Sequence, residues 1–169
     1  MLELAKYTEN DYHLYAQLVF NEQTMNMNLG RVFTDDEAAS FFQMMLRCNH
    51  ANDGLGFYQV FAKQDGNSQY IGMGALTWND EDHAIEIEYM LLPSFWNQGY
   101  GTELVKQLLR MANKAHREPD IVAVTDPDNI YSKRILQHAG FTLVRQYVND
   151  DGDPAELYAK RSEYASEES

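Results

Sequence analysis

A change in the period of the hydrophobic pattern constrains the fold of this chain more than any other feature. Over residues 57–91, apolar residues recur at every second position, in three stretches separated by turn-rich segments at 64–67 and 79–82. A period of two is typical of β-strands, and short polar turns between such stretches predict an antiparallel meander. After residue 101 the apolar positions follow a helical period instead, so a helix is expected soon after the meander.

Helices and strands on both sides of the meander indicate one α/β domain of the α+β type. Thr34 and Glu37 have capping-box spacing and predict a helix that runs to about His50. Residues 8–21 are expected to form another helix, and the polar, Met-rich residues 22–33 a loop. The remaining expected elements are a strand at 2–7, a helix at 102–116, a buried strand at 121–125, a helix after residue 129, and a hairpin of strands 141–148 and 155–160.

Charge and cysteine content exclude several classes of partner and site. The 169 residues include 13 Lys and Arg against 26 Asp and Glu, a net charge of −13, which disfavours nucleic acid and anionic membranes as partners. The single cysteine, Cys48, rules out an internal disulfide framework, and the histidines lack metal-ligand spacing, so no metal site is expected. No secretory signal is visible, and we expect a cytoplasmic protein.

The segment from Trp96 to Thr102, WNQGYGT, is the most informative for chemistry. Gly99 and Gly101 let backbone amides approach a ligand closely, and the helix start behind them adds unpaired N–H donors and positive potential. Such a turn is a candidate phosphate cradle. The same glycines would also suit a tight strand-to-helix turn with no ligand.

Two nucleotide-binding motifs do not fit this segment. A P-loop ends in Gly-Lys-Ser/Thr, whereas this chain has Thr102 and Glu103 after the second glycine. A dinucleotide fingerprint requires a third glycine where Leu104 stands, and it follows the first strand of a βαβ unit rather than a meander.

The chain resembles the GNAT superfamily of acyl-CoA-dependent N-acetyltransferases over nearly its whole length. The resemblance lies in residues 86–103, EIEYMLLPSFWNQGYGTE, and in the motifs NIYS at 129–132 and AGF at 139–141. The first stretch is similar to the RimJ/RimL-like branch, which contains the ribosomal-protein alanine acetyltransferases. The resemblance implies a mixed, mostly antiparallel sheet of about six to seven strands, opened like a V, with helices on both faces. It implies a single domain over residues 1–161 and an acidic tail at 162–169.

The resemblance also implies acetyl-CoA as a co-substrate. Backbone amides of the glycine segment would bind its pyrophosphate, and the end of the strand 84–91 would pair with the pantetheine arm. Asn129 would cap its own helix, contact the pantetheine, or do both. The expected contacts are Met90, Leu91, Leu92, Trp96, Asn97, Gln98, Gly99, Tyr100, Gly101, Thr102, Asn129 and Ser132.

Acetyl transfer to an amine requires a base, because an alkylamine with a pKa near ~10 is protonated at neutral pH. Glu86 and Glu88 share one face of a strand, and repulsion between like charges this close raises one pKa. Two ordinary carboxylates on a solvated face would give the same pattern. Glu86 matches the acidic position of the family and Glu88 a position that is commonly small, so we rank Glu86 first and Glu88 second.

The usual family tyrosine one helix turn before the Gly-Phe pair is Leu136 here. Tyr131 or Ser132 could act as the acid instead, although a thiolate leaving group with a pKa near ~8.5 needs little help. The three loop aspartates of the last hairpin would either rim the acceptor site or form a soluble turn. They are Asp150, Asp151 and Asp153.

The predicted function is transfer of an acetyl group from acetyl-CoA to a primary amine by direct attack in a ternary complex. Two alternatives remain: a non-catalytic acyl-CoA-binding or sensing module, and a purely structural α/β domain. The sequence does not name the acceptor, which could be a protein N-terminus, a small amine or an aminoglycoside-like compound. A homodimer is an expectation from the family alone.

Overall fold

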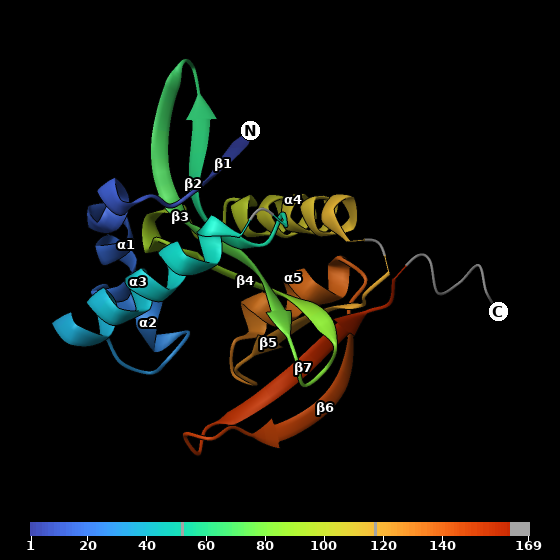
Figure 1. Ribbon diagram of the computed structural model, residues 1–169. Coiled ribbons are helices and arrows are strands. Elements are labelled where there is room, and N and C mark those ends of the chain that lie inside the picture. The colour runs from blue at the N-terminus through green and yellow to red at the C-terminus, as the bar shows by residue number, and fades with distance from the viewer. Residues whose placement is uncertain (52, 117, 163–169) are drawn as a thin grey trace.

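The predicted meander lies at the centre of the sheet in the computed structural model (Figure 1), which describes residues 1–51, 53–116 and 118–162. Its strands pair antiparallel in chain order, with the first strand of the chain at the edge. These strands are β1 (Leu2–Lys6), β2 (Gly56–Gln64), β3 (Asn67–Asn79) and β4 (Ala84–Leu91).

The second half of the chain completes a seven-stranded sheet of order β1-β2-β3-β4-β5-β7-β6. Its strands are β5 (Ile121–Thr125), β6 (Thr142–Val148) and β7 (Pro154–Lys160). The β4–β5 pair is parallel and all other neighbours are antiparallel. The prediction of a mixed, mostly antiparallel sheet is therefore confirmed.

The sheet opens between β4 and β5. Only two residue pairs join these strands, Ile85 with Ile121 and Glu86 with Val122, and the Ile85 N–H also donates to the Asp120 carbonyl at 3.0 Å. From residue 87 to 91, β4 has no partner on β5. The two strands thus form the arms of a V whose interior is lined by backbone groups of β4.

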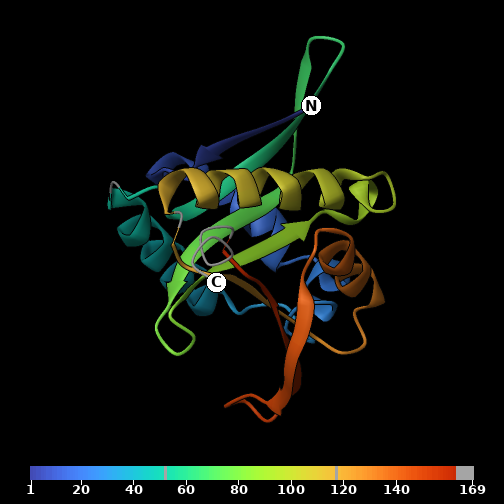
Figure 2. The same ribbon diagram turned by 90° about the vertical axis from the view of Figure 1, so that its right-hand side faces the viewer.

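Five α-helices cover the two faces of the sheet. Figure 2 shows α4, in yellow, in front of the strands, and the blue and teal helices behind them. The bounds are α1 (Tyr12–Val19), α2 (Glu22–Asn26) and α3 (Asp35–His50) on one face, and α4 (Tyr100–Ala115) and α5 (Ile130–His138) on the other. Short 3-10 turns at Glu9–Asp11 and Pro93–Phe95 precede α1 and α4.

The caps predicted at Thr34 and Asn129 are confirmed, whereas the helix expected at residues 8–21 is a 3-10 turn at Glu9–Asp11 followed by α1. Thr34 and Glu37 form the expected capping box of α3. The prediction of a continuous loop at residues 22–33 is wrong, because residues 22–26 form α2. The side chain of Asn21 accepts the Thr24 N–H at 3.0 Å, and the burial of Thr24 and Met25 stabilises this short helix. The predicted acidic tail lies, from residue 163 onward, outside the described residues.

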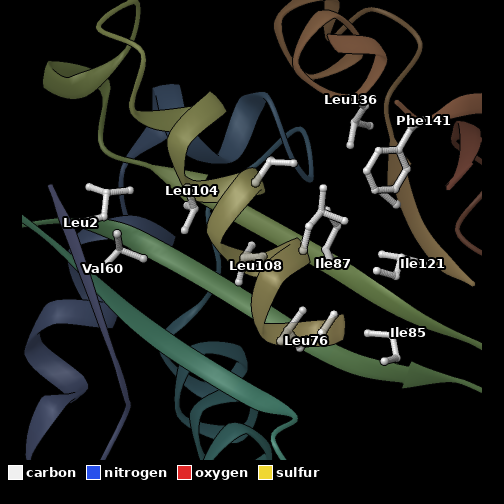
Figure 3. Packing of buried hydrophobic residues seen from close by; sticks show 14 of the residues in the cluster. Leu2, Val60, Leu76, Ile85, Ile87, Leu104, Leu108, Ile121, Leu136 and Phe141 are labelled. Carbon is white, nitrogen blue, oxygen red and sulfur yellow. The ribbon is translucent and has the colours of Figure 1, made fainter. Parts of the chain in front are cut away.

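Two hydrophobic cores flank the sheet, and each belongs to one set of helices. The core under α4 and α5 joins Leu104 and Leu108 of α4 to Ile87 of β4, as Figure 3 shows. The core under α1 and α3 contains Tyr15 and Phe42. In the described part of the chain, no helix has both the length and the apolar character needed to cross a bilayer.

Replacement of Leu108 by Ala tests the core under α4. Leu108 is fully buried, so Leu108→Ala should lower the free energy of unfolding by about 2–5 kcal/mol, because it removes buried methyl groups and leaves a cavity. Urea denaturation measures this change. Leu143→Ala is the matched control: its side chain is 46% exposed, and its effect should stay within about 0.5 kcal/mol.

Candidate functional site

The glycine segment forms an uncapped helix start at the end of β4. Asn97 and Gly99 have left-handed backbone conformations, with φ of 61° and 84°. Gly99 is the N-cap residue of α4, and no side chain accepts a hydrogen bond from the first turn. A Cβ at Gly99 would meet no atom within 4 Å, so the turn faces open space. The first N–H groups of α4 are therefore available to an anionic ligand.

Close packing fixes this helix start beside α5. A Cβ on Gly101 would lie 2.8 Å from Cδ1 of Ile135, so a larger residue here would require the Ile135 side chain to move. The Trp96 indole N–H donates to the Leu91 carbonyl at 2.8 Å, and the Thr24 hydroxyl donates to the same oxygen at 3.5 Å. The end of β4 and the start of α4 are thereby held together at the mouth of the V.

The strand register decides which backbone groups face the opening. The Leu92 N–H donates to the Ile71 carbonyl at 2.8 Å, on the β3 side. Because backbone groups alternate in direction along a strand, those of Met90 also point to β3, whereas those of Tyr89 and Leu91 point into the V. Of the three strand-end residues predicted to pair with pantetheine, Leu91 has the suitable orientation, and Tyr89 joins it.

The start of α5 closes the V on the α4 side. Asn129 caps α5 by accepting the Ser132 N–H at 3.1 Å, and its amide NH₂ has no hydrogen-bond partner among the described residues. The hydroxyls of Ser132 and Tyr89 lie 2.7 Å apart, so one hydrogen bond spans the opening. Burial raises the pKa of Tyr89 to about 12, so Tyr89 keeps its proton near neutral pH.

Glu86 and Glu88 lie on the opposite side of β4, toward α1 and α3, as their alternation with Ile87 predicts. The Glu86 carboxylate accepts a hydrogen bond from the Asn79 amide at 3.0 Å, while burial raises its pKa. The Glu88 carboxylate forms no hydrogen bond or ion pair with any described residue. Burial, assisted by the charge of Glu86, raises the pKa of Glu88 to about 7.

Several other predicted residues have different surroundings. Tyr131 is 56% exposed on α5, whereas Leu136, at the usual tyrosine position, is fully buried. The Gln98 side chain donates to the Ser94 carbonyl at 2.7 Å and so stabilises the turn before α4. Among the described residues, no group of three or more His, Cys, Asp or Glu side chains could hold a metal ion.

Three residues of the site were not identified from the sequence. Tyr89 stood out only as a core position of its strand, Thr24 lay in a predicted loop, and Asn79 in a predicted turn. Tyr89 contacts Ser132 and Thr24 contacts Leu91, across 43 and 67 positions of the chain respectively. Spacing along one element carries no information about such contacts.

A family model described as an acetyltransferase (GNAT) domain matches residues 1–142. Among curated proteins, the FsC-acetyl coenzyme A-N(2)-transacetylase of Aspergillus fumigatus is 25% identical over 162 residues, which cover 90% of this chain and 67% of that protein. In two further curated relatives the matched region covers 63% and 48% of their length. This chain thus spans about half to two thirds of the curated relatives it matches.

Solved structures share the fold at low sequence identity. A GNAT-family acetyltransferase from Bacillus anthracis has a TM-score of 0.78 at 19% identity, covering 96% of this chain and 95% of that one. A spermidine N-acetyltransferase from Vibrio cholerae, in complex with CoA and spermine, has a TM-score of 0.75 at 15% identity, covering 95% of both chains. A ribosomal-protein-S5-alanine acetyltransferase from Vibrio fischeri has a TM-score of 0.75 at 16% identity, covering 96% and 93%.

Stability measurements test the surroundings of Glu88. A pKa of about 7 means that the folded chain holds a proton that the unfolded chain loses near pH 4.5. Wild-type stability should therefore fall, relative to Glu88→Gln, as pH rises from 5 to 8. We expect the variant to gain roughly 1–3 kcal/mol over wild type across this range in urea denaturation. Parallel pH profiles of the two proteins would contradict the raised pKa.

Proposed function

The chain belongs to the acetyltransferase (GNAT) family, and from this premise we propose that it transfers the acetyl group of acetyl-CoA to a primary amine. The observation that carries the proposal is the opening between β4 and β5. It has backbone donors at its mouth, a hydroxyl pair on one face and a carboxylate without a partner on the other. These are the groups needed to hold a thioester and to remove a proton from an amine.

Acetyl-CoA, the co-substrate, supplies the acetyl group as a thioester. The N–H groups at the start of α4, from Tyr100 to Thr102, would hold the pyrophosphate of CoA. The Tyr89 backbone and the Leu91 N–H would pair with the peptide-like pantetheine arm, as in strand addition. The amide of Asn129 would donate to the same arm from α5. The residues present therefore fit this co-substrate.

Glu88 rather than Glu86 is the proposed base. Glu86 is paired with Val122 in the joined part of the β4–β5 ladder and already accepts the Asn79 amide. Glu88 lies beyond the last β4–β5 pair, next to the backbone that faces the V. Its pKa of about 7 suits a group that takes a proton from an ammonium and releases it to water near neutral pH. The neutral nitrogen then attacks the thioester carbonyl directly, and the C–S bond breaks.

Ser132 is proposed to donate a hydrogen bond to the departing sulfur. Either hydroxyl of this pair can be the donor; the proposal is that Tyr89, which keeps its proton, donates to the Ser132 oxygen, so that the serine hydrogen is available to the ligand. Tyr89 is thus a positioning residue. The thiolate that leaves has a pKa of about 8.5 and needs only such a hydrogen bond. The reaction can therefore proceed although Leu136 stands where the family usually has a tyrosine.

We also propose that the chain belongs to the RimJ/RimL-like branch, which the resemblance of residues 86–103 supports. Proteins with this fold are named for different acceptors, among them spermidine and a ribosomal protein. Branch membership therefore does not select the acceptor. The alternative of a CoA-binding module without catalysis is tested by the same experiment as the transferase.

The decisive experiment measures CoA thiol release with a primary amine at saturating acetyl-CoA. Glu88→Gln should lower kcat by about 100-fold or more, since a general base contributes roughly that factor. Wild-type kcat/KM should rise with pH to a plateau above about pH 7, whereas the variant should lack this transition.

Asp80→Asn is the control for that variant, because Asp80 is an exposed carboxylate on the nearby β3–β4 turn. It should retain the rate and the pH profile. An unchanged profile in Glu88→Gln would assign the base elsewhere. Calorimetric binding of acetyl-CoA without thiol release from any amine would favour the sensing module.

A double-mutant cycle tests the Ser132–Tyr89 pair. Ser132→Ala should lower kcat by about tenfold, the value of one lost hydrogen bond to a developing charge. Tyr89→Phe should lower it less, and the double variant should be no slower than Ser132→Ala, because Tyr89 acts only through Ser132. Additive losses would contradict this positioning role. A larger loss from Tyr131→Phe would assign the hydrogen bond to Tyr131.

A further inference from the structure

We infer that the acceptor is an aliphatic amine with a second positive charge near its reacting nitrogen. Glu88 receives the proton of the reacting ammonium, and Glu86 binds the second cationic group. This inference rests on the proposed function, because it names the substrate class of the same site. It derives from the polar groups and charges on the α1 side of β4.

Two polar groups on the α1 side of β4, the Glu88 carboxylate and the Tyr15 hydroxyl, have no partner among the described residues. Tyr15 of α1 is only 1% exposed, yet its hydroxyl forms no hydrogen bond with any described residue. Every fully buried polar side-chain atom of the described chain does have a partner. The small exposed part of Tyr15 is therefore its hydroxyl. Burial chiefly raises the pKa of Tyr15, followed by Tyr12 and Tyr70 and then by the charge of Glu88, and the Tyr15 side chain belongs to the core on the same side of β4 as Glu88.

No cation among the described residues neutralises this carboxylate pair. Arg145 of β6 forms ion pairs with Asp82 at 2.8 Å and with Glu81 at 3.6 Å rather than with either glutamate of β4. Burial is the main cause of the raised pKa of each carboxyl group. The charge of Glu86 also raises the pKa of Glu88. The charge of Asp82 also raises the pKa of Glu86. A bound cation would relieve this repulsion, whereas an anion would add to it.

The spacing of the two glutamates sets the separation of the charges. Residues two apart on a strand are about 7 Å apart and point to the same face. A short alkyl chain between two amino groups spans a comparable distance. A peptide N-terminus would instead place a neutral amide near Glu86, where it would leave that carboxylate without a cation.

Three acceptors of matched length test the inference with the wild-type protein: putrescine, n-butylamine and γ-aminobutyrate. They place a cation, a methyl group and a carboxylate, respectively, at the end distant from the reacting amine. We expect kcat/KM for putrescine to exceed that for butylamine by at least about tenfold, as for a charge-assisted hydrogen bond. γ-Aminobutyrate should be the slowest. Equal rates for putrescine and butylamine would overturn the inference.

Glu86→Gln tests the residue assigned to the second charge. Glutamine has the same shape and can still accept the Asn79 hydrogen bond, so the turn should be preserved. The ratio of kcat/KM for putrescine to that for butylamine should fall to about two or less. Asp80→Asn, which removes an exposed charge from the same turn, should keep the wild-type ratio. Retention of the ratio by Glu86→Gln would overturn the role of Glu86.

Failure of the inference differs from failure of the proposed function. A short peptide with a free α-amine that is acetylated faster than putrescine would overturn the substrate class and leave the transferase function intact. Acetyl-CoA binding with no thiol release from putrescine, butylamine, γ-aminobutyrate or the peptide would overturn both. The comparison of acceptors uses only wild-type protein, so it does not depend on the folding of any variant.

Discussion

The end of the β4–β5 ladder after two residue pairs is the constraint on which the site depends. Up to Glu86 the strands share hydrogen bonds, and beyond it β4 follows β3 while β5 leads into α5. Hydrogen bonds from Trp96 and Thr24 to the Leu91 carbonyl fix the free end of β4. The Tyr89 backbone and the Leu91 N–H therefore have no partner on β5, and the cost of this exposure makes a strand-like ligand favourable there.

The two faces of β4 separate the two halves of the proposed reaction. One face has uncharged donors, the start of α4 and the hydroxyls of Tyr89 and Ser132, which suit an anionic co-substrate. The other has the carboxyl groups of Glu86 and Glu88, which suit a cationic acceptor. A chain with a net charge of −13 repels CoA as a whole, so local backbone dipoles must provide its binding.

The elements of this fold that could be predicted from the sequence are those with a local signal, such as a periodic pattern or a capping motif. The period-two stretches gave all three strands of the meander, and the capping box at Thr34 gave the start of α3. Residues 22–26 were missed, because a five-residue helix has too little periodicity to detect and depends on burial of Met25. The Tyr89–Ser132 hydrogen bond was equally inaccessible, because tertiary packing alone brings residues 43 positions apart together.

The ranking of Glu86 and Glu88 as candidate bases shows the same limit of prediction from the sequence. The alternation of residues along the strand placed both glutamates on one face, and the resemblance to the family ranked Glu86 first. Neither argument could predict which groups contact each carboxylate. The Asn79 amide donates a hydrogen bond to the Glu86 carboxylate, whereas burial and the like charge of Glu86 set the raised pKa of Glu88. Different surroundings separate the pKa values of two similar groups and hence their roles. One glutamate thereby suits proton transfer near neutral pH, and the other, which accepts the Asn79 amide, is the proposed partner of a second cation.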